Sequence, residues 1–245
     1  MEVHAHTHTA RKKWTHYLWE FLMLFLAVFC GFLAEYQLEH KIEKDREKEY
    51  ILSLVEDLSE DSLTIFENTI LLKANVERMD SLKFLLCGND VRDRGADLYY
   101  LGRLASRGDR LTVNDRTIQQ MKNSGGFRLI RKENVSKAII GYYNKVSYIN
   151  WLESIELNES DTYRKMAIEV FHPVIFDGLI KADDTIIKSL DNPSLLTYDK
   201  EVLIRLAGMV TYTKNTRLGL LKEEGRLLVN ANKLVSLLKK EYHLK

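Results

Sequence analysis

Three histidines near the N-terminus have the residue type and spacing that could bind a metal. His4, His6 and His8 occupy alternate positions. Side chains at alternate positions of an extended segment point the same way, and three imidazoles could then hold a zinc, copper or nickel ion. A short histidine-rich terminus also occurs without any metal role. We therefore predict no metal or other cofactor, and keep these three residues as the candidate ligands if a metal binds.

Glu20 is the single Asp, Glu, Lys or Arg in an apolar run that spans positions 14–34. In a helix it shares a face with Ala27, Gly31 and Ala34, a stripe of small residues of the kind that lets transmembrane helices pack closely. An acid on that face would point toward protein, and several copies could form a carboxylate ring that lines a polar path. The alternative is an interfacial Glu20 that reaches the lipid headgroups.

The most distinctive local sequence pattern lies between positions 114 and 130. A predicted helix, Asn114 to Asn123, is followed by a helix-ending Ser-Gly-Gly and then by an arginine between apolar residues. This pattern predicts a tight corner between two helices. The alternative is a ligand pocket around the arginine. In either case the residues involved are Gln120, Asn123, Ser124, Gly125, Gly126 and Arg128.

The motifs of the common catalytic sites are missing from the chain. It has no HExxH, no CxxC, no GxxxxGK[ST] and no GxSxG. Cys30 lies in the apolar run, and Cys87 has no histidine nearby in the sequence that could activate it. We therefore predict a protein without enzymatic activity.

Composition narrows the class of protein further. The chain has 245 residues, 36 Lys and Arg, 35 Asp and Glu, and two Cys, which excludes a small disulfide-stapled scaffold and a disordered tail. From Glu35 onward there are 33 basic and 33 acidic residues. A part of the chain with no net charge has no bulk attraction for DNA or RNA, so we predict no nucleic-acid partner.

Residues 14–35 are predicted to form a transmembrane helix, with the lipid bilayer as its partner. A helix over the apolar run is about 31 Å long, which matches the hydrocarbon thickness of a bilayer. Trp14, Tyr17 and Trp19 stand at its start and Tyr36 at its end, as interfacial aromatic residues do. The alternative, a cleaved signal peptide, is disfavoured because no small-x-small cleavage site follows the run.

The basic residues on the two sides of this helix bear on its orientation. The short tail, residues 1–13, ends in three consecutive basic residues that abut the helix. The charged segment 36–50 has four basic residues, but they are interleaved with acids. This pattern favours an N-terminus inside the cell and a C-terminal domain outside, although the counts of Lys and Arg alone are close.

The charged segment and the residues after it are predicted to form one long helix. No Gly or Pro occurs between Gly31 and Gly88, so 36–50 is predicted to be a helical stalk, and the helix should end at Cys87. Apolar residues recur at a spacing of seven, with Val55 and Val76 between them, which predicts a coiled-coil-like seam. The seam residues are Ile51, Leu58, Ile65, Leu72, Met79 and Leu86.

Further helices are predicted over 96–106, 132–171 and from about 199 to 240. The second has an apolar stripe at Val135, Ile139, Tyr142, Val146 and Ile149. The third has one at Leu203, Leu206, Val210, Leu220, Leu227, Leu234 and Leu238, and its Gly208 and Gly219 could allow close helix approach. Together the patterns predict an all-α protein, in which an N-terminal transmembrane helix continues into an elongated antiparallel helical bundle at 51–245.

The chain also resembles a family of bacterial single-pass membrane proteins, found mainly in Bacteroidota, that is described only as a domain of unknown function. The resemblance covers most of the chain. Its strongest points are Trp19-Glu20-Phe21, Leu54 to Asp61, Gln120 to Ile130 and Tyr142-Tyr143. It implies an envelope protein and supplies no activity, substrate or catalytic residue. Together with the orientation favoured by the basic residues, this predicts a protein of the bacterial inner membrane with a cytoplasmic N-terminus and a periplasmic C-terminal domain.

Three non-enzymatic functions remain open at this point, beside an enzyme whose catalytic residues would come together only in the folded structure. The first is a non-enzymatic scaffold or accessory subunit, either a homo-oligomer or part of a membrane complex, that associates through the Ala27, Gly31 and Ala34 face and the seam. The second is a homo-oligomeric pore with a ring of Glu20 side chains. The third is a helical-bundle ligand sensor that acts through a partner.

Overall fold

The computed structural model describes residues 13–108 and 110–244. The chain divides into two units, residues 1–49 and residues 50–245, and helix α1 (Trp14–Cys87) contributes to both. Among the described residues the regular structure is helical, apart from one isolated bridge between Ile180 and Ile186. The predicted all-α class is confirmed. The charged segment 36–50 is helical as expected, and α1 ends at the predicted residue.

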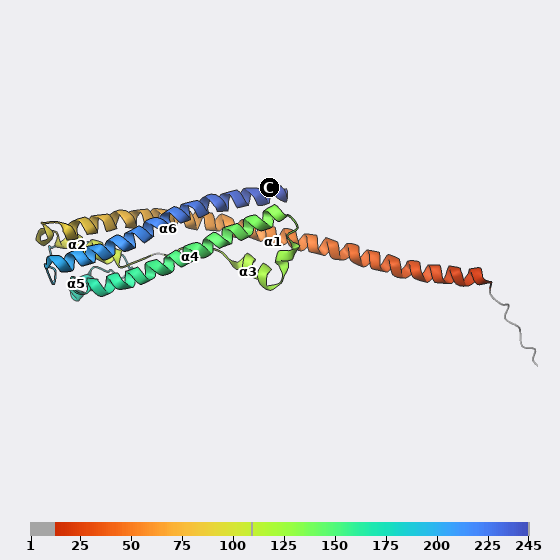
Figure 1. The fold of residues 1–245 in the computed structure, drawn as a ribbon, viewed down its shortest axis with the longest axis horizontal. Helices are drawn as coiled ribbons and strands as arrows, with labels where there is room; N and C mark the ends of the chain where they lie inside the picture. The colour runs from red at the N-terminus through yellow and green to blue at the C-terminus, as the bar shows by residue number, and fades with distance from the viewer. Residues whose placement is uncertain (1–12, 109, 245) are drawn as a thin grey trace, which may run out of the picture. The chain divides into compact units, whose positions relative to one another are not determined.

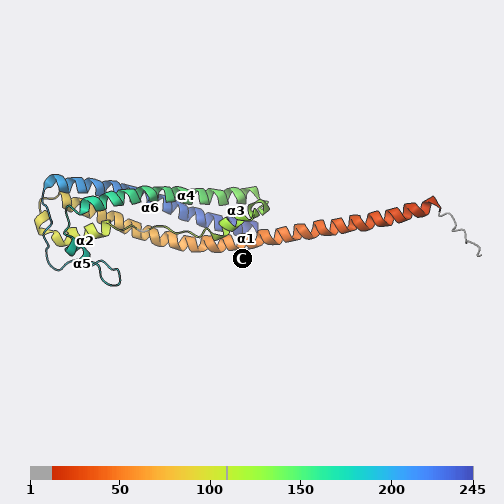
Figure 2. The ribbon, with the colours of Figure 1, turned by 90° about the horizontal axis from the view of Figure 1, so that it is seen from below.

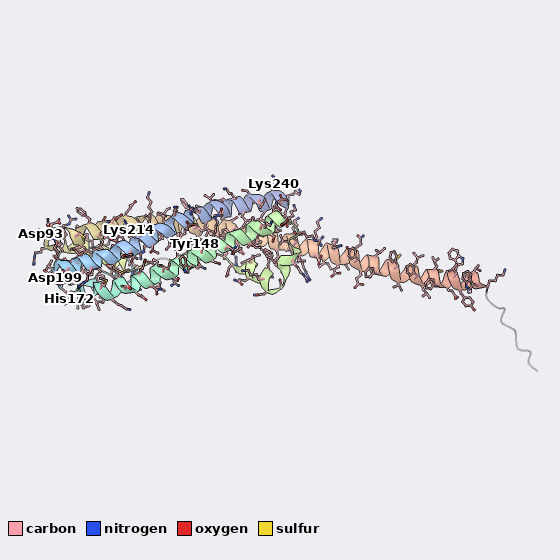
Figure 3. All side chains as sticks on the ribbon, viewed as in Figure 1. Asp93, Tyr148, His172, Asp199, Lys214 and Lys240 are labelled. Carbon is pink, nitrogen blue, oxygen red and sulfur yellow. The ribbon has the colours of Figure 1, made fainter. Side chains whose placement is uncertain are left out.

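Three long helices form the second unit. The C-terminal part of α1, helix α4 (Glu133–Ala167) and helix α6 (Lys200–Glu241) lie side by side (Figures 1 and 2). Figure 3 shows His172, just after α4, and Asp199, just before α6, at one end of the bundle and Lys240 at the other. Helix α6 is therefore antiparallel to α4, whereas α1 and α4 run in the same direction because the chain crosses back between them.

Short elements close the two ends of this bundle. At the end near Cys87 lie the 3₁₀ helix η1 (Val91–Asp93), helix α2 (Gly95–Ala105) and helix α5 (Pro173–Gly178). At the opposite end lie helix α3 (Arg116–Asn123) and the 3₁₀ helix η2 (Gly126–Leu129). A side chain at Gly95 would place its Cβ 2.0 Å from the carbonyl oxygen of Pro193, so only glycine fits there.

The predicted seam of α1 is buried inside the chain. All six of its residues are at most 3% exposed. The second buried row of the helix begins at Leu54 and includes Asp61 and Asn68, whereas Val55 and Val76 are only partly buried. Because this seam packs against α4 and α6 of the same chain, it is not available for the self-association that its coiled-coil pattern suggested.

On α4 and α6, as on α1, the side chains that face the core recur at alternating spacings of three and four residues. The predicted apolar stripes of both helices are buried. They contribute to two apolar clusters, one near Ile51 and one near Leu86. The expectation for Gly208 and Gly219 was wrong, because a Cβ at either position would meet nothing within 4 Å.

Helix α4 ends four residues earlier than expected. Its last helical residue is Ala167, and turns carry the chain to Phe171 before Pro173 opens α5. Val170 and Phe171 are buried in the cluster near Leu86. Packing of these side chains therefore sets the path of the chain here, before the proline is reached.

Candidate functional site

The apolar segment of α1 is exposed along its whole length in the single chain. Of the described helices, only α1 is long and apolar enough to cross a membrane, and no part of its most apolar window is buried. Ala27, Gly31 and Ala34 are all exposed, and a Cβ at Gly31 would meet nothing within 4 Å. The stripe of small residues is thus present on the helix and unpacked within this chain.

Glu20 has a partner on its own helix that sequence reasoning missed. The Nε2 atom of His16, one turn earlier, lies 3.2 Å from Oε1 of Glu20, and about half of each side chain is exposed. The signal for this pair was the spacing of four residues, which brings two side chains together on a helix. A local partner near the aromatic start of the segment is compatible with the interfacial interpretation, and the carboxylate ring stays a prediction.

The segment from Gln120 to Arg128 forms a corner between helices. Gly125 has a φ of 68°, the left-handed conformation that glycine tolerates best, and the Ser124 hydroxyl accepts a hydrogen bond from the amide of Gly126 at 3.3 Å. Tyr50 packs on this corner: its hydroxyl lies 3.0 Å from Oγ of Ser124, and a Cβ at Gly126 would lie 2.6 Å from its ring.

The ligand alternative for this corner gains no support from the side chains. Gln120, Asn123 and Arg128 are exposed. The neighbouring pocket is lined instead by Ile118, Gln119 and other residues of α3, of α4 and of the segment that precedes α3, residues 110–115. Binding of a ligand at Arg128 stays a prediction.

A set of buried and half-buried polar side chains interrupts the apolar core of the bundle. We call it the polar layer; it consists of Asn68, Glu153, Glu156, Ser160, Thr213, Arg217 and Glu224. Asn68 and Glu224 lie within the cluster near Ile51, and the other five lie between the two clusters. Each member occupies a position where the repeat of its helix would otherwise place an apolar residue. This alternation of three and four residues was the signal that could have found the layer from the sequence.

Arg217 is the largest fully buried side chain in the described part of the protein, at 1% exposure. Its Nε and one terminal nitrogen donate to Oε1 of Glu156 at 2.9 and 2.6 Å. The same terminal nitrogen donates to the carbonyl oxygen of Arg107 at 2.7 Å, and Ser160 donates to the shared carboxylate oxygen at 2.9 Å. The ion pair is therefore supported by hydrogen bonds from three directions.

Glu224 is also buried, at 1% exposure, but without a cationic partner among the described contacts. Its two carboxylate oxygens accept hydrogen bonds from Nδ2 of Asn68 at 3.0 and 2.9 Å. Burial raises the pKa of Glu224 to about 7, Asn68 acts in the opposite direction, and the charge of Glu153 adds to the increase. The carboxyl group can thus change its charge near neutral pH.

Acids in and beside the polar layer hold the connector that crosses back along the bundle, whose described residues are 106–108 and 110–115. Glu153 accepts a hydrogen bond from the amide of Leu111 at 2.8 Å, and Asp61 accepts one from the amide of Asn114 at 2.6 Å. Tyr142 donates to the other oxygen of Asp61 at 2.7 Å. Burial raises the pKa values of Asp61 and Glu153. Because Asp61 and Glu153 bind backbone amides of the connector, their role is to hold this segment in place.

The other chemical candidates add no site within the described residues. His4, His6 and His8 lie outside them. In the part of the chain that the structure describes, no group of three or more His, Cys, Asp or Glu residues is arranged to hold a metal ion. Cys30 and Cys87 are exposed free thiols.

Comparisons of the chain with protein-family models, with curated proteins and with solved structures found no match. The resemblance to the Bacteroidota membrane-protein family stays a prediction.

Proposed function

We propose that this chain is a single-pass protein of the bacterial inner membrane, and that its helical domain, residues 50–245, serves as a scaffold or accessory subunit without enzymatic activity. One observation carries the proposal: the apolar segment of α1 is long enough to cross a bilayer and none of its most apolar window is buried. A core helix of a soluble protein would be covered by its own chain. Lipid is the environment that covers so large an apolar surface at the lowest free energy.

Self-association is proposed through the face of α1 that carries Ala27, Gly31 and Ala34. The coiled-coil seam is already occupied within the chain, whereas this face is unpacked. Small residues let two helix backbones approach closely in lipid, where van der Waals contact drives association. The acids of the helical domain support a non-enzymatic role, because Asp61 and Glu153 are bound to backbone amides.

The membrane topology can be tested with the native cysteine of the helical domain. In a Cys30→Ser variant, exposed Cys87 is the single remaining thiol. We expect a membrane-impermeant maleimide to label Cys87 in intact spheroplasts, and the protein to stay in the membrane after carbonate extraction. Cys87→Ser in the native background is the control and should abolish labelling. Labelling that requires lysis would reverse the orientation, and release by carbonate would refute the anchor.

The association face can be tested by adding a side chain to it. Gly31→Leu should convert an oligomer into monomers, because a bulky residue separates two closely packed helices. The measurement is the mass of the complex in a mild detergent. Phe25→Leu is the control, since Phe25 lies about 200° around the helix from Ala27 and should leave assembly unchanged. An oligomer that survives Gly31→Leu would contradict association through this face.

A further inference from the structure

An open pocket of about 870 Å³ lies where the C-terminal ends of α2 and α4 meet α5. Figures 1 and 2 both place these three segments at the same end of the bundle. This volume is in the range of small-molecule sites, roughly 300–1,000 Å³. The pocket is separate from the corner near Arg128 and from the apolar segment of α1.

One side of the pocket is apolar. The rings of Phe171 and Phe176 stack with centroids 5.0 Å apart and an angle of 14° between their planes. Ile168 and Val174 also line the pocket, and each is 73% exposed. Phe171 is only 2% exposed and lies behind the partly exposed ring of Phe176. The surface on which an apolar chain could lie and leave water is therefore formed by Phe176, Ile168 and Val174.

The other side of the pocket is cationic. Arg103, Arg107 and Arg164 line it, and Asp177 is the one acid among the described lining residues. Arg164 donates to the carbonyl oxygen of Ser106 and pairs with Asp161 at 2.6 Å. Two of the three arginines thus have partners at the rim, because Arg107 likewise donates to the carbonyl oxygen of Asp184 at 2.9 Å.

Arg103 is the exception. Its Nε is buried and has no hydrogen-bond partner among the described residues. Its guanidinium carbon lies 5.1 Å from the centroid of the Phe176 ring, so the cation stands at the boundary of the apolar side. Burial and the positive charge of Arg107 lower the pKa of Arg103, the charge of Asp177 acts in the opposite direction, and Arg164 lowers the pKa further. A buried donor among like charges is stabilised by an anion.

We propose that this pocket binds a small organic anion that carries an apolar chain, with the anionic group at Arg103 and the chain on Ile168, Val174 and Phe176. The guanidinium fork matches a carboxylate or a phosphate group, and the exposed apolar side chains match a hydrocarbon chain. Neither half of the pocket alone selects this chemistry. The juxtaposition of an unpartnered arginine nitrogen and an exposed apolar wall does.

The test uses the full chain in nanodiscs of zwitterionic lipid, with octanoate as the probe in isothermal titration calorimetry and empty nanodiscs as the background. We expect octanoate to bind, and acetate, inorganic phosphate and octanamide to bind at least about tenfold more weakly, since each lacks one half of the ligand. Equal binding of phosphate or acetate would reduce the pocket to a plain anion site and overturn the proposal. Equal binding of octanamide would do so by removing the role of charge.

Two substitutions separate the halves of the pocket. Arg103→Gln should weaken octanoate binding about tenfold or more, because it removes a charge-assisted hydrogen bond. Ile168→Asn should also weaken it, and its side chain is too exposed for the change to unfold the domain. Exposed Arg205→Gln and half-exposed Ile204→Asn on α6 are the matched controls and should bind as the native chain does. Unchanged binding in Arg103→Gln, or no binding by the native chain, would overturn the proposal.

Discussion

Arg217→Leu is expected to lower the free energy of unfolding by about 3–5 kcal/mol, the usual cost of removing one partner of a buried ion pair. The substitution leaves the Glu156 carboxylate without its cation and the carbonyl oxygen of Arg107 without its donor. The 1% exposure of Arg217 means that water cannot replace these bonds without opening the bundle. Urea unfolding of the full chain in detergent, followed by circular dichroism, measures the change.

Two further variants show whether burial is the cause. Arg226→Ala removes an exposed pair with Glu223 at 2.5 Å and should cost at most about 1 kcal/mol. Arg217→Leu combined with Glu156→Leu should recover much of the lost stability, since both charges then leave the interior together. A single variant that loses less than about 1 kcal/mol, or a double variant less stable than Arg217→Leu, would contradict the importance of the buried pair.

Glu224 should make the protein less stable as the pH rises through neutrality. Its folded-state pKa is raised from 4.5 to about 7. Below pH 4.5 the carboxyl group is neutral in both states, whereas above pH 7 the folded state must hold a buried charge. The stabilisation present at low pH is therefore lost between these values, by roughly 3 kcal/mol at 1.36 kcal/mol per pH unit. Asp61 and Glu153, whose pKa values are also raised, act in the same direction.

The variant that tests this assignment is Glu224→Gln, which keeps the shape and can still bond to Asn68. Its stability should change less between pH 5 and pH 8 than that of the native chain, and it should exceed the native stability at pH 8. Glu67→Gln, at an exposed position of α1, is the control and should keep the native pH dependence. Parallel pH profiles for the native chain and Glu224→Gln would show that another group is responsible.

The long helices could be predicted because their apolar residues repeat over many turns. Ile51 to Leu86 on α1 and Leu203 to Leu238 on α6 each contribute a stripe that has no stable place except a core. The end of α1 at Cys87 was predictable from Gly88, and the start of α6 was predictable from Asp199, whose side chain accepts hydrogen bonds from the amides of Glu201 and Val202.

The polar layer and the path between the helices could not be found in the same way. Thr213, Arg217 and Glu224 stand at regular positions of the α6 stripe, but a search for apolar residues alone does not select them. Arg217 and its partner Glu156 are 61 residues apart in the sequence, and Glu224 and its partner Asn68 are 156 residues apart. No local sequence pattern encodes pairs at such separations. The connector that allows α1 and α4 to run in the same direction is likewise held over long sequence separations, by hydrogen bonds from the backbone amides of Leu111 to Glu153 and of Asn114 to Asp61.

The polar layer also fixes the register of the bundle. The apolar rows of the long helices repeat every seven residues, so sliding α6 past α1 and α4 by about 10.5 Å would bring apolar residues together again. That slip would move Arg217 from Glu156 to the level of Ile149 or Tyr163, so the buried cation would lose its carboxylate. It would also move Glu224 from Asn68 to the level of Asp61 or Asn75. A purely apolar bundle would tolerate several alignments of different length. The polar layer selects one of these alignments. It therefore sets the length of the domain and the distance between its two ends.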